Sequence, residues 1–324
     1  MILCAGEALI DMIPATTVDG DQAFVPRAGG APFNTAIALA RLGEKVGFAT
    51  GLSLDSMGAL LLERGSDSGV NMDGSVRSQR PTTLAMVTLV NGQAEYNFYD
   101  SGSALREIQP GELTLPSPAP AAALFGGICL ASEPCGAAFE ALFDTARAAG
   151  VTILFDPNIR PAFVTDEGNF RARISRMMAR SDIVKLSDED LEWLMGAGDV
   201  ATHAQTILKL GPSMLCVTQG GNGVTAYLNE KTVSVPAEKV DVIDTVGAGD
   251  TFNAGFLAGL SQKNALSRDG VAKLSESTIT HALTLGARAA AICVSRAGAN
   301  PPTLAEVDAQ FQAEKSLFKQ KTHP

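Results

Sequence analysis

The sequence stretch with the clearest chemistry is Asp244-Thr-Val-Gly-Ala-Gly-Asp-Thr-Phe-Asn253, in which a glycine-bracketed turn leads into an apolar helix. The first N–H groups of a helix have no intrahelical acceptor and lie at the positive end of its dipole, so Gly247, Ala248 and Gly249 could bind a phosphate. Asp250 follows directly, and a carboxylate there could take the proton from a hydroxyl that attacks the phosphate. The alternative is that Asp250 only stabilises the helix start.

A second stretch near the other end of the chain has a related form. Gly29-Gly30-Ala-Pro-Phe-Asn34 opens a stretch of helical periodicity that ends at Gly43. Paired glycines permit close approach of the backbone to a ligand, and the Asn34 amide can both donate to and accept from a hydroxyl.

Together the two stretches resemble the N- and C-terminal signatures of the ribokinase-like, or PfkB, family of carbohydrate kinases, and the resemblance runs from Gly6 to about Pro302. It implies an enzyme that transfers the γ-phosphoryl group of ATP to a sugar hydroxyl and requires Mg²⁺. Asp250 would be the general base, and the N–H groups of Gly247, Ala248, Gly249 and Asp250 would stabilise the charge on the transferring phosphoryl group. The motif set is most similar to that of bacterial fructokinases.

The resemblance also implies a set of substrate-binding residues. They are Asp11, Gly29, Gly30, Asn34, Tyr99 and Arg160. Asp11 follows the first predicted strand and would accept hydrogen bonds from sugar hydroxyls, or would only form a turn before Pro14. Arg160 ends Asp156-Pro-Asn-Ile-Arg160 and suits contact with the transferred phosphoryl group. A loop salt bridge between Asp156 and Arg160 is the alternative.

Three further sites follow from the resemblance. Ser187-Asp-Glu-Asp190 stands where the family has Asn-x-x-Glu, so Asp190 or Glu189 would hold Mg²⁺ through water, or the segment would only cap a helix. A glycine turn would contact the nucleotide through Thr218, Gly220 and Gly223. Backbone at Asp244, Val246 and Gly298 would hold a monovalent cation such as K⁺.

The composition excludes several kinds of partner. The formal net charge is −10 and no Lys/Arg cluster interrupts it, which argues against nucleic acid and anionic membranes as partners. The five cysteines are scattered, as expected of free thiols in a reducing compartment. Without a basic leader or a run of about 20 apolar residues, the chain is predicted to be cytoplasmic.

Strand-like and helix-like patterns alternate along the chain and predict one α/β domain over residues 1–324, with a mainly parallel sheet covered on both faces. The predicted strands are residues 2–9, 45–50, 127–130, 151–155, 183–186 and 214–218. The predicted helices are residues 33–42, 56–66, 136–149, 169–179, 188–194, 201–210, 250–260, 277–294 and 304–317.

Two segments, about 12–28 and 80–102, interrupt the alternation. The second contains two strand patterns around Asn91-Gly92, the strongest short hairpin signal. In the resembled family such strands form a lid over the sugar and often a dimer contact, which implies a homodimer. An edge meander of the main sheet is the alternative.

The sequence does not determine which sugar is phosphorylated. A 2-keto-3-deoxygluconate kinase is the first alternative, followed by a ribokinase or a nucleoside kinase. An anionic sugar acid would favour a cation after Phe98-Tyr99, where this chain has Asp100. From a different class, the protein could be a catalytically silent sugar-binding or regulatory relative, although the intact Gly-Ala-Gly-Asp argues against it. Neither a P-loop nor a dinucleotide-binding glycine motif is present.

Overall fold

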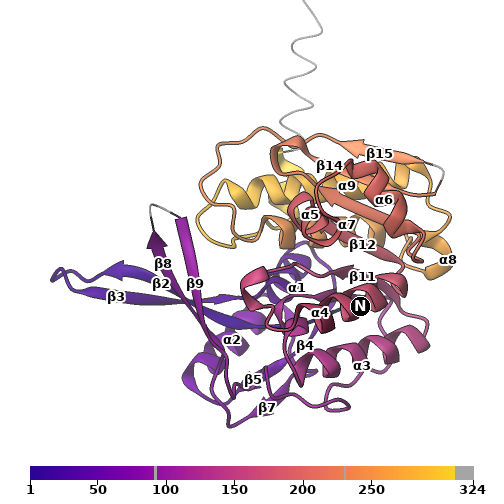
Figure 1. Ribbon diagram of the computed structural model, residues 1–324. Helices are drawn as coiled ribbons and strands as arrows, with labels where there is room; N and C mark the ends of the chain where they lie inside the picture. Colours follow the sequence, from indigo (N-terminus) through magenta and orange to yellow (C-terminus); the bar gives the residue numbers. More distant parts are fainter. Residues whose placement is uncertain (91–92, 230, 311–324) are drawn as a thin grey trace, which may run out of the picture.

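The computed structural model describes residues 1–90, 93–229 and 231–310, and its largest element over these residues is a nine-stranded sheet (Figure 1). The strand order is β15-β14-β13-β12-β11-β10-β1-β4-β6, in which β14 is antiparallel to both of its neighbours, β13 and β15, and all other pairs are parallel. The strands are β1 Ile2–Ala5, β4 Val46–Ala49, β6 Val70–Asn71, β10 Ala122–Gly126, β11 Thr152–Asp156, β12 Ile183–Ser187, β13 Met214–Thr218, β14 Val224–Tyr227 and β15 Thr232–Val235.

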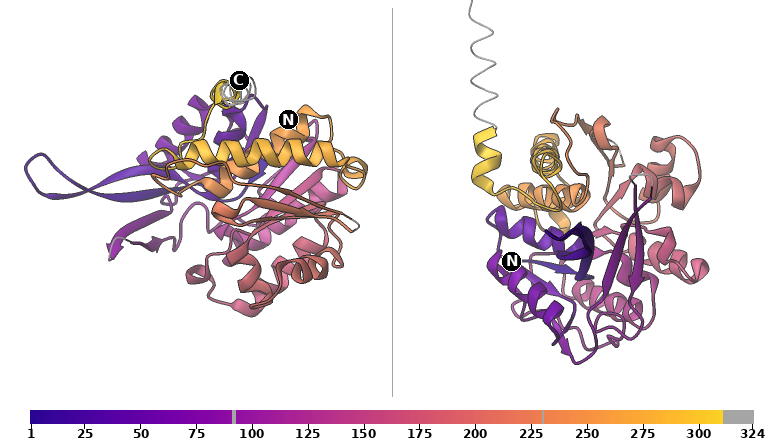
Figure 2. Two further views of the ribbon diagram at one scale, coloured as in Figure 1. Left: turned by 90° about the horizontal axis from the view of Figure 1, so that it is seen from above. Right: turned by 90° about the vertical axis from the view of Figure 1, so that its left-hand side faces the viewer.

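Helices cover both faces of this sheet, and each face has its own apolar cluster (Figure 2). One cluster takes side chains from α1 Ala31–Arg41, α2 Ser56–Asp67, α7 Ala248–Gln262, the short α8 Arg268–Val271 and α9 Glu276–Val294. The other takes them from α3 Cys135–Ala148, α4 Glu167–Ala179, α5 Asp188–Met195 and α6 Val200–Leu208. The predicted α/β architecture is confirmed. Among the described residues no helix is long and apolar enough to cross a membrane.

Helix α7 lies deep in the molecule because glycines let it approach α9. A Cβ on Gly255 would stand 2.7 Å from the Gly286 Cα atom, and a Cβ on Gly259 would stand 2.6 Å from the Ala282 Cα atom. Eleven consecutive residues of α7, from Asp250 to Leu260, are buried. The first turn of α7 is therefore held at a fixed position relative to the sheet.

A second, four-stranded sheet extends away from the main body (Figures 1 and 2). Its order is β3-β2-β8-β9, with β2 Leu9–Thr16, β3 Gln22–Gly29, β8 Leu84–Val90 and β9 Gln93–Tyr99. Its two hairpins are antiparallel, whereas β2 and β8 at its centre pair in parallel. We call these four strands the lid sheet. The predicted separate sheet is confirmed and the edge-meander alternative is wrong, while the Asn91-Gly92 turn lies outside the described residues.

Two strand predictions are wrong in their bounds. The strand expected over residues 2–9 ends at Ala5, because the chain turns at Gly6 and Glu7 and then enters the lid sheet as β2. Asp11 therefore lies in the lid sheet rather than at the end of a main-sheet strand. The strand expected over residues 127–130 is a short 3₁₀ helix, Ile128–Ala131, and the sheet strand is the preceding β10. Gly127, with φ of 92°, makes the turn between the two.

Several short elements had no clear sequence signal. They include β5 Gly51–Ser53, which pairs with β7 Val76–Ser78, and the edge strand β15. Residues 304–310 are helical, and the rest of the helix predicted over 304–317 lies outside the described residues.

The strand order reverses at β1, which has β4 on one side and β10 on the other. In open α/β sheets, ligands bind outside the carboxyl ends of the strands at such a switch point. Gly6 and Glu7 follow β1 at this edge, and Gly127 follows β10. The carboxyl edge near β1, β10 and β11 is therefore the place to look for a site.

Candidate active site

The two glycine motifs of the sequence meet at this edge. Asn34, in the first turn of α1, donates from Nδ2 to Oδ2 of Asp250, in the first turn of α7, over 2.9 Å. The hydroxyl of the next residue, Thr35, donates to the backbone oxygen of Asp250 over 3.2 Å. The Asp250 residue is only 7% exposed. The structure thus places the carboxylate in a fixed position between two helix starts.

The groups around Asp250 shift the pKa of its carboxyl group. Burial raises the pKa of Asp250 to about 6, and the negative charge of Asp156 acts in the same direction. The hydrogen bond from Asn34 and the positive charges of Lys185 and Arg160 lower it. A carboxylate with this pKa is mostly ionised at neutral pH and is a stronger base than an ordinary aspartate, as a general base requires.

Beside Asp250 lies a buried ion pair that the sequence analysis missed. The Lys185 Nζ atom, in β12, is 3.0 Å from Oδ2 of Asp156, at the end of β11. The Asn253 side chain donates to the same oxygen over 2.7 Å. Burial lowers the pKa of Lys185, but the carboxylates of Asp156, Asp190 and Asp250 raise it by more, so it lies above the usual value. A lysine within an apolar strand pattern was the signal that could have revealed it.

Arg160 does not pair with Asp156 in the structure, so the alternative of a loop salt bridge between them is wrong. Asp156 instead pairs with Lys185, and it accepts the Asn158 backbone N–H at its other oxygen over 3.1 Å. Arg160 is exposed and donates to its neighbour's carbonyl, Ile159 O, over 3.0 Å. Its guanidinium is still close enough to lower the pKa of Asp250.

The turn before α7 has the form expected of an anion site. Gly247 is left-handed, with φ of 79°, and a Cβ on it would stand 2.9 Å from the Ala299 side chain. The Ala248 N–H donates to Thr245 O over 3.2 Å. Gly249 and Asp250 occupy first-turn positions, where N–H groups have no intrahelical acceptor. Two backbone donors and the helix dipole therefore lie next to the Asp250 carboxylate.

Asp11 and Gly29 contact each other across the β2–β3 hairpin. A Cβ on Gly29 would stand 2.2 Å from Oδ2 of Asp11, so any other residue would displace this carboxylate from its observed position. Burial raises the pKa of Asp11 to about 6. Gly30, with φ of 107°, is the N-cap of α1, and a Cβ there would stand 2.5 Å from Glu7 O. These residues connect the lid sheet to the helix that carries Asn34.

Tyr99 ends β9 and is 64% exposed. The next residue, Asp100, accepts hydrogen bonds from the hydroxyls of Thr83 and Ser103, at 2.7 and 2.9 Å. Arg106 lies 3.4 Å from its other oxygen. The sequence analysis missed Arg106, a cation close to the lid strands, because it comes seven residues after Tyr99 rather than beside it. Asp100 therefore does not make this region uniformly negative.

The Asp190 side chain caps the start of α5 and also binds the loop after β11. Its side chain accepts the Ser187 N–H over 3.1 Å, and the Ser187 hydroxyl accepts the Asp190 N–H over 2.9 Å, which is the predicted helix cap. Its second oxygen accepts the Ile159 N–H over 2.9 Å. Glu189 is exposed. No cluster of three potential metal-ligating side chains occurs among the described residues.

The predicted nucleotide residues lie further along the same edge. Thr218 ends β13 opposite Ser187 of β12, and Gly220 and Gly223, with φ of 51° and 93°, form the turn to β14. The predicted monovalent-cation residues also come together, because the Asp244 carboxylate accepts the N–H groups of Val246 and Gly298 over 3.0 and 2.8 Å.

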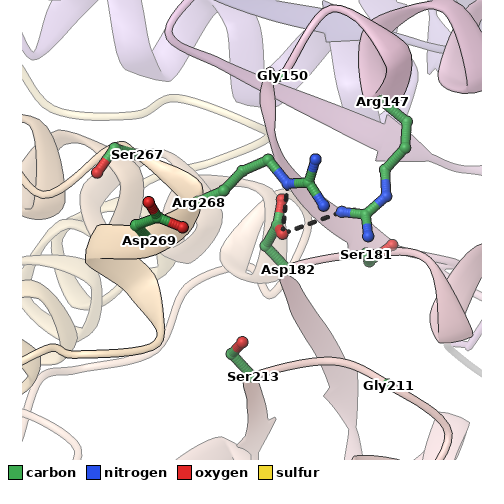
Figure 3. A pocket seen from close by; sticks show the side chains of 9 residues that line it. All are labelled: Arg147, Gly150, Ser181, Asp182, Gly211, Ser213, Ser267, Arg268 and Asp269. Atoms are coloured by element: carbon green, nitrogen blue, oxygen red, sulfur yellow. Dashed lines mark hydrogen bonds and ion pairs between the residues drawn. The ribbon is translucent and has the colours of Figure 1, made fainter.

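A cavity of about 650 Å³ lies elsewhere, at the amino ends of β11, β12 and β13 (Figure 3). Arg147 and Arg268 both donate to Oδ1 of Asp182 there, over 3.1 and 3.3 Å. The other Asp182 oxygen accepts the Ile153 N–H over 2.8 Å. This network attaches α8 to the sheet, and none of the predicted site residues lines the cavity.

Comparison with known proteins places the chain among carbohydrate kinases. A family model described as pfkB family carbohydrate kinase matches residues 1–306. A fructokinase of Rhizobium leguminosarum bv. trifolii is 49% identical over 279 residues, covering 86% of this chain and 85% of that protein. The crystal structure of fructokinase with bound ATP from Xylella fastidiosa has a TM-score of 0.87 and 30% identity, covering 97% of this chain and 98% of that one. A fructokinase of Vibrio cholerae O395, in fructose, ADP and calcium ion bound form, has a TM-score of 0.82 and 26% identity, with coverages of 95% and 97%.

Proposed function

The chain belongs to the pfkB family of carbohydrate kinases, and we propose that it is a fructokinase that uses ATP. The observation that carries this function is the buried Asp250 carboxylate, which Asn34 orients beside the first N–H groups of α7. The 49% identity to a bacterial fructokinase supports fructose as the sugar.

In the proposed reaction a fructose hydroxyl oxygen attacks the γ-phosphorus of ATP. Asp250 accepts the hydroxyl proton as the new P–O bond forms, and the bond to the bridging oxygen breaks to release ADP. The N–H groups of Gly249 and Asp250, in the first turn of α7 after Gly247 and Ala248, stabilise the charge on the transferring phosphoryl group. Arg160, exposed at this edge and close enough to affect Asp250, contacts the same group.

The lid sheet covers the sugar in this proposal. Asp11 would accept hydrogen bonds from sugar hydroxyls beside Gly29 and Gly30, and Tyr99 would contact the sugar from β9. Closure of the lid sheet over the sugar excludes water that would otherwise react with ATP in place of the sugar. The exposed lid strands are also the surface through which we propose that a homodimer forms. The cytoplasmic location stays a prediction.

Thr218, Gly220 and Gly223 would contact the nucleotide. Mg²⁺ in such sites is held mainly by phosphates and water with one or two carboxylates, so the absence of a three-residue cluster in the described chain fits this mode of binding. Glu189 or Asp190 would contact its waters, and the ion would offset phosphate charge. Backbone at Asp244, Val246 and Gly298 would hold K⁺.

One observation favours a second candidate function. Arg106 beside Asp100 places a cation near the lid strands, and an anionic sugar acid would pair with it. A 2-keto-3-deoxygluconate kinase is therefore the alternative to test first.

The test is an ADP-release assay with fructose, glucose, ribose, 2-keto-3-deoxygluconate, adenosine and inosine as acceptors. We expect fructose to give the highest kcat/KM, and no ADP release with any sugar once EDTA has removed Mg²⁺. A kcat/KM for another acceptor tenfold above that for fructose would overturn the choice of sugar. A protein that binds sugar without releasing ADP would be the silent relative instead.

A further inference from the structure

We propose that Lys185 and Asp156 are positioning residues for the reaction, a buried charge pair that holds the first turn of α7 and balances the charge beside Asp250. The proposal rests on the function given above, in which Asp250 is the proton acceptor.

The geometry of the pair is the first argument. The Lys185 and Asp156 side chains are 3% and 4% exposed, and their charged atoms are 3.0 Å apart. The same Asp156 oxygen accepts the Asn253 side-chain amide over 2.7 Å. Asn253 comes three residues after Asp250 in α7, so the two side chains lie on the same side of the helix. Asp156 therefore joins the end of β11 to the helix turn that carries the base.

The position of Lys185 is the second argument. Its Nζ atom would stand 3.2 Å from a Cβ on Gly249, directly before Asp250. A helix start is positive, so a buried ammonium group there is unfavourable unless negative charges compensate it. A buried ion pair is also weak evidence for stability, since well-packed apolar residues often do as well. The location of this pair beside Asp250 therefore favours a role in the reaction over a role in stabilising the fold.

The pair acts on Asp250 in opposite directions. The groups that affect Asp250 are Asn34 from α1, Asp156 from β11, Arg160 from the loop after β11, and Lys185 from β12. From α9, Cys293 is also near, and burial raises the pKa of its thiol. Asp156 raises the pKa of Asp250 and Lys185 lowers it. Removing one member should therefore shift the pKa of Asp250, whereas removing both should shift it much less.

The experiment compares Lys185→Met, Asp156→Asn and the double variant with the parent. The measurement is kcat/KM for fructose from pH 5 to 9 at saturating MgATP. We expect the acid midpoint to rise by about one pH unit in Lys185→Met and to fall by a similar amount in Asp156→Asn. The double variant should have a midpoint between the two. Arg147→Met, which breaks the ion pair at the opposite end of the sheet, is the matched control and should leave the midpoint unchanged.

If the pair has only a structural role, activity should fall equally at every pH, or the midpoints of Lys185→Met and Asp156→Asn should move in the same direction. Either outcome overturns the proposal. If Lys185→Met does not fold, Asp156→Asn alone must still lower the midpoint, and Lys185→Arg must retain the parental one. Asp250→Asn in the same series distinguishes failure of the proposed function from failure of the charge-pair proposal. If that variant stays active, the proposed function fails; if it is inactive while the midpoints stay fixed, only the charge-pair proposal fails.

Discussion

Asn34 donates a 2.9 Å hydrogen bond to Asp250, although 216 positions separate the two residues in the sequence. The bond uses the Oδ2 atom and so holds the carboxylate in one orientation. It also joins the glycine motif at one end of the chain to the glycine motif at the other. The two motifs thus come together only in the folded protein.

Replacing Asp250 with Asn should stop the chemistry without harming the fold. Loss of a general base costs about 10²–10⁴ in rate, so kcat should fall by at least that much while fructose and ATP still bind. Because burial raises the pKa of Asp250, the fold disfavours its charged form, and the neutral Asn variant should melt at the same temperature as the parent or higher at pH 8.

Asp55→Asn is the matched control, since Asp55 also begins a helix but accepts N–H groups from Gly58 and Thr82. It should lower the melting temperature and leave kcat near the parental value. Retention of more than about a tenth of parental kcat by Asp250→Asn would contradict the base role.

The pH dependence of the parent enzyme should follow Asp250. The pKa of its buried carboxyl group lies at about 6, and only the ionised form accepts a proton. The kcat/KM for fructose should therefore rise from pH 5 to 7 with a midpoint near 6 and stay level above it. Asn34→Ala removes a hydrogen bond that lowers this pKa, so its midpoint should lie higher. An Asn34→Ala midpoint below the parental one would show that another group titrates.

Gly29→Ala should weaken sugar binding. The added Cβ would stand 2.2 Å from Oδ2 of Asp11, and this carboxylate can move away with little effect on the fold. Loss of a charged hydrogen bond to the sugar should raise KM for fructose by about tenfold or more, with KM for ATP unchanged. Gly47→Ala, whose Cβ makes only ordinary contacts, is the control. Equal KM values in both variants would remove Asp11 from the sugar site.

The lid sheet should become more protected when sugar binds. Fructose with a non-hydrolysable ATP analogue should slow amide hydrogen exchange in segments 12–28 and 80–102, because closing the lid buries their backbone. Helix α3, which lies away from the lid sheet in Figure 1, should exchange at the same rate. Equal exchange in the lid segments with and without ligand would argue that these strands do not cover the sugar.

Local patterns predicted the helices, most strands and the separate lid hairpin, because turn residues and apolar periodicity specify them directly. That Asn34 and Asp250 belong to one site was implied by a family resemblance, but no local pattern joins residues so far apart, and their hydrogen bond comes from the structure. The lysine in the apolar pattern of β12 signalled a buried charge at Lys185, but its partner Asp156 could not be predicted, because the alternation of strands and helices does not say which side chains meet between β11 and β12. The end of β1 was misplaced for a similar reason: Gly6 to Ala8 carry the chain from one sheet to another, and apolar residues continue on both sides.

The lid sheet and α1 are joined by a single residue. Strand β3 ends at Gly29 and α1 begins at Ala31, so Gly30 is the only residue between them. A displacement of β3 toward a sugar must therefore displace the helix start that carries Asn34. In the proposed reaction, the movement that encloses the substrate therefore also acts on Asn34, whose amide donates to the proton-accepting carboxylate of Asp250. Enclosure of the sugar and orientation of the base are then parts of one motion.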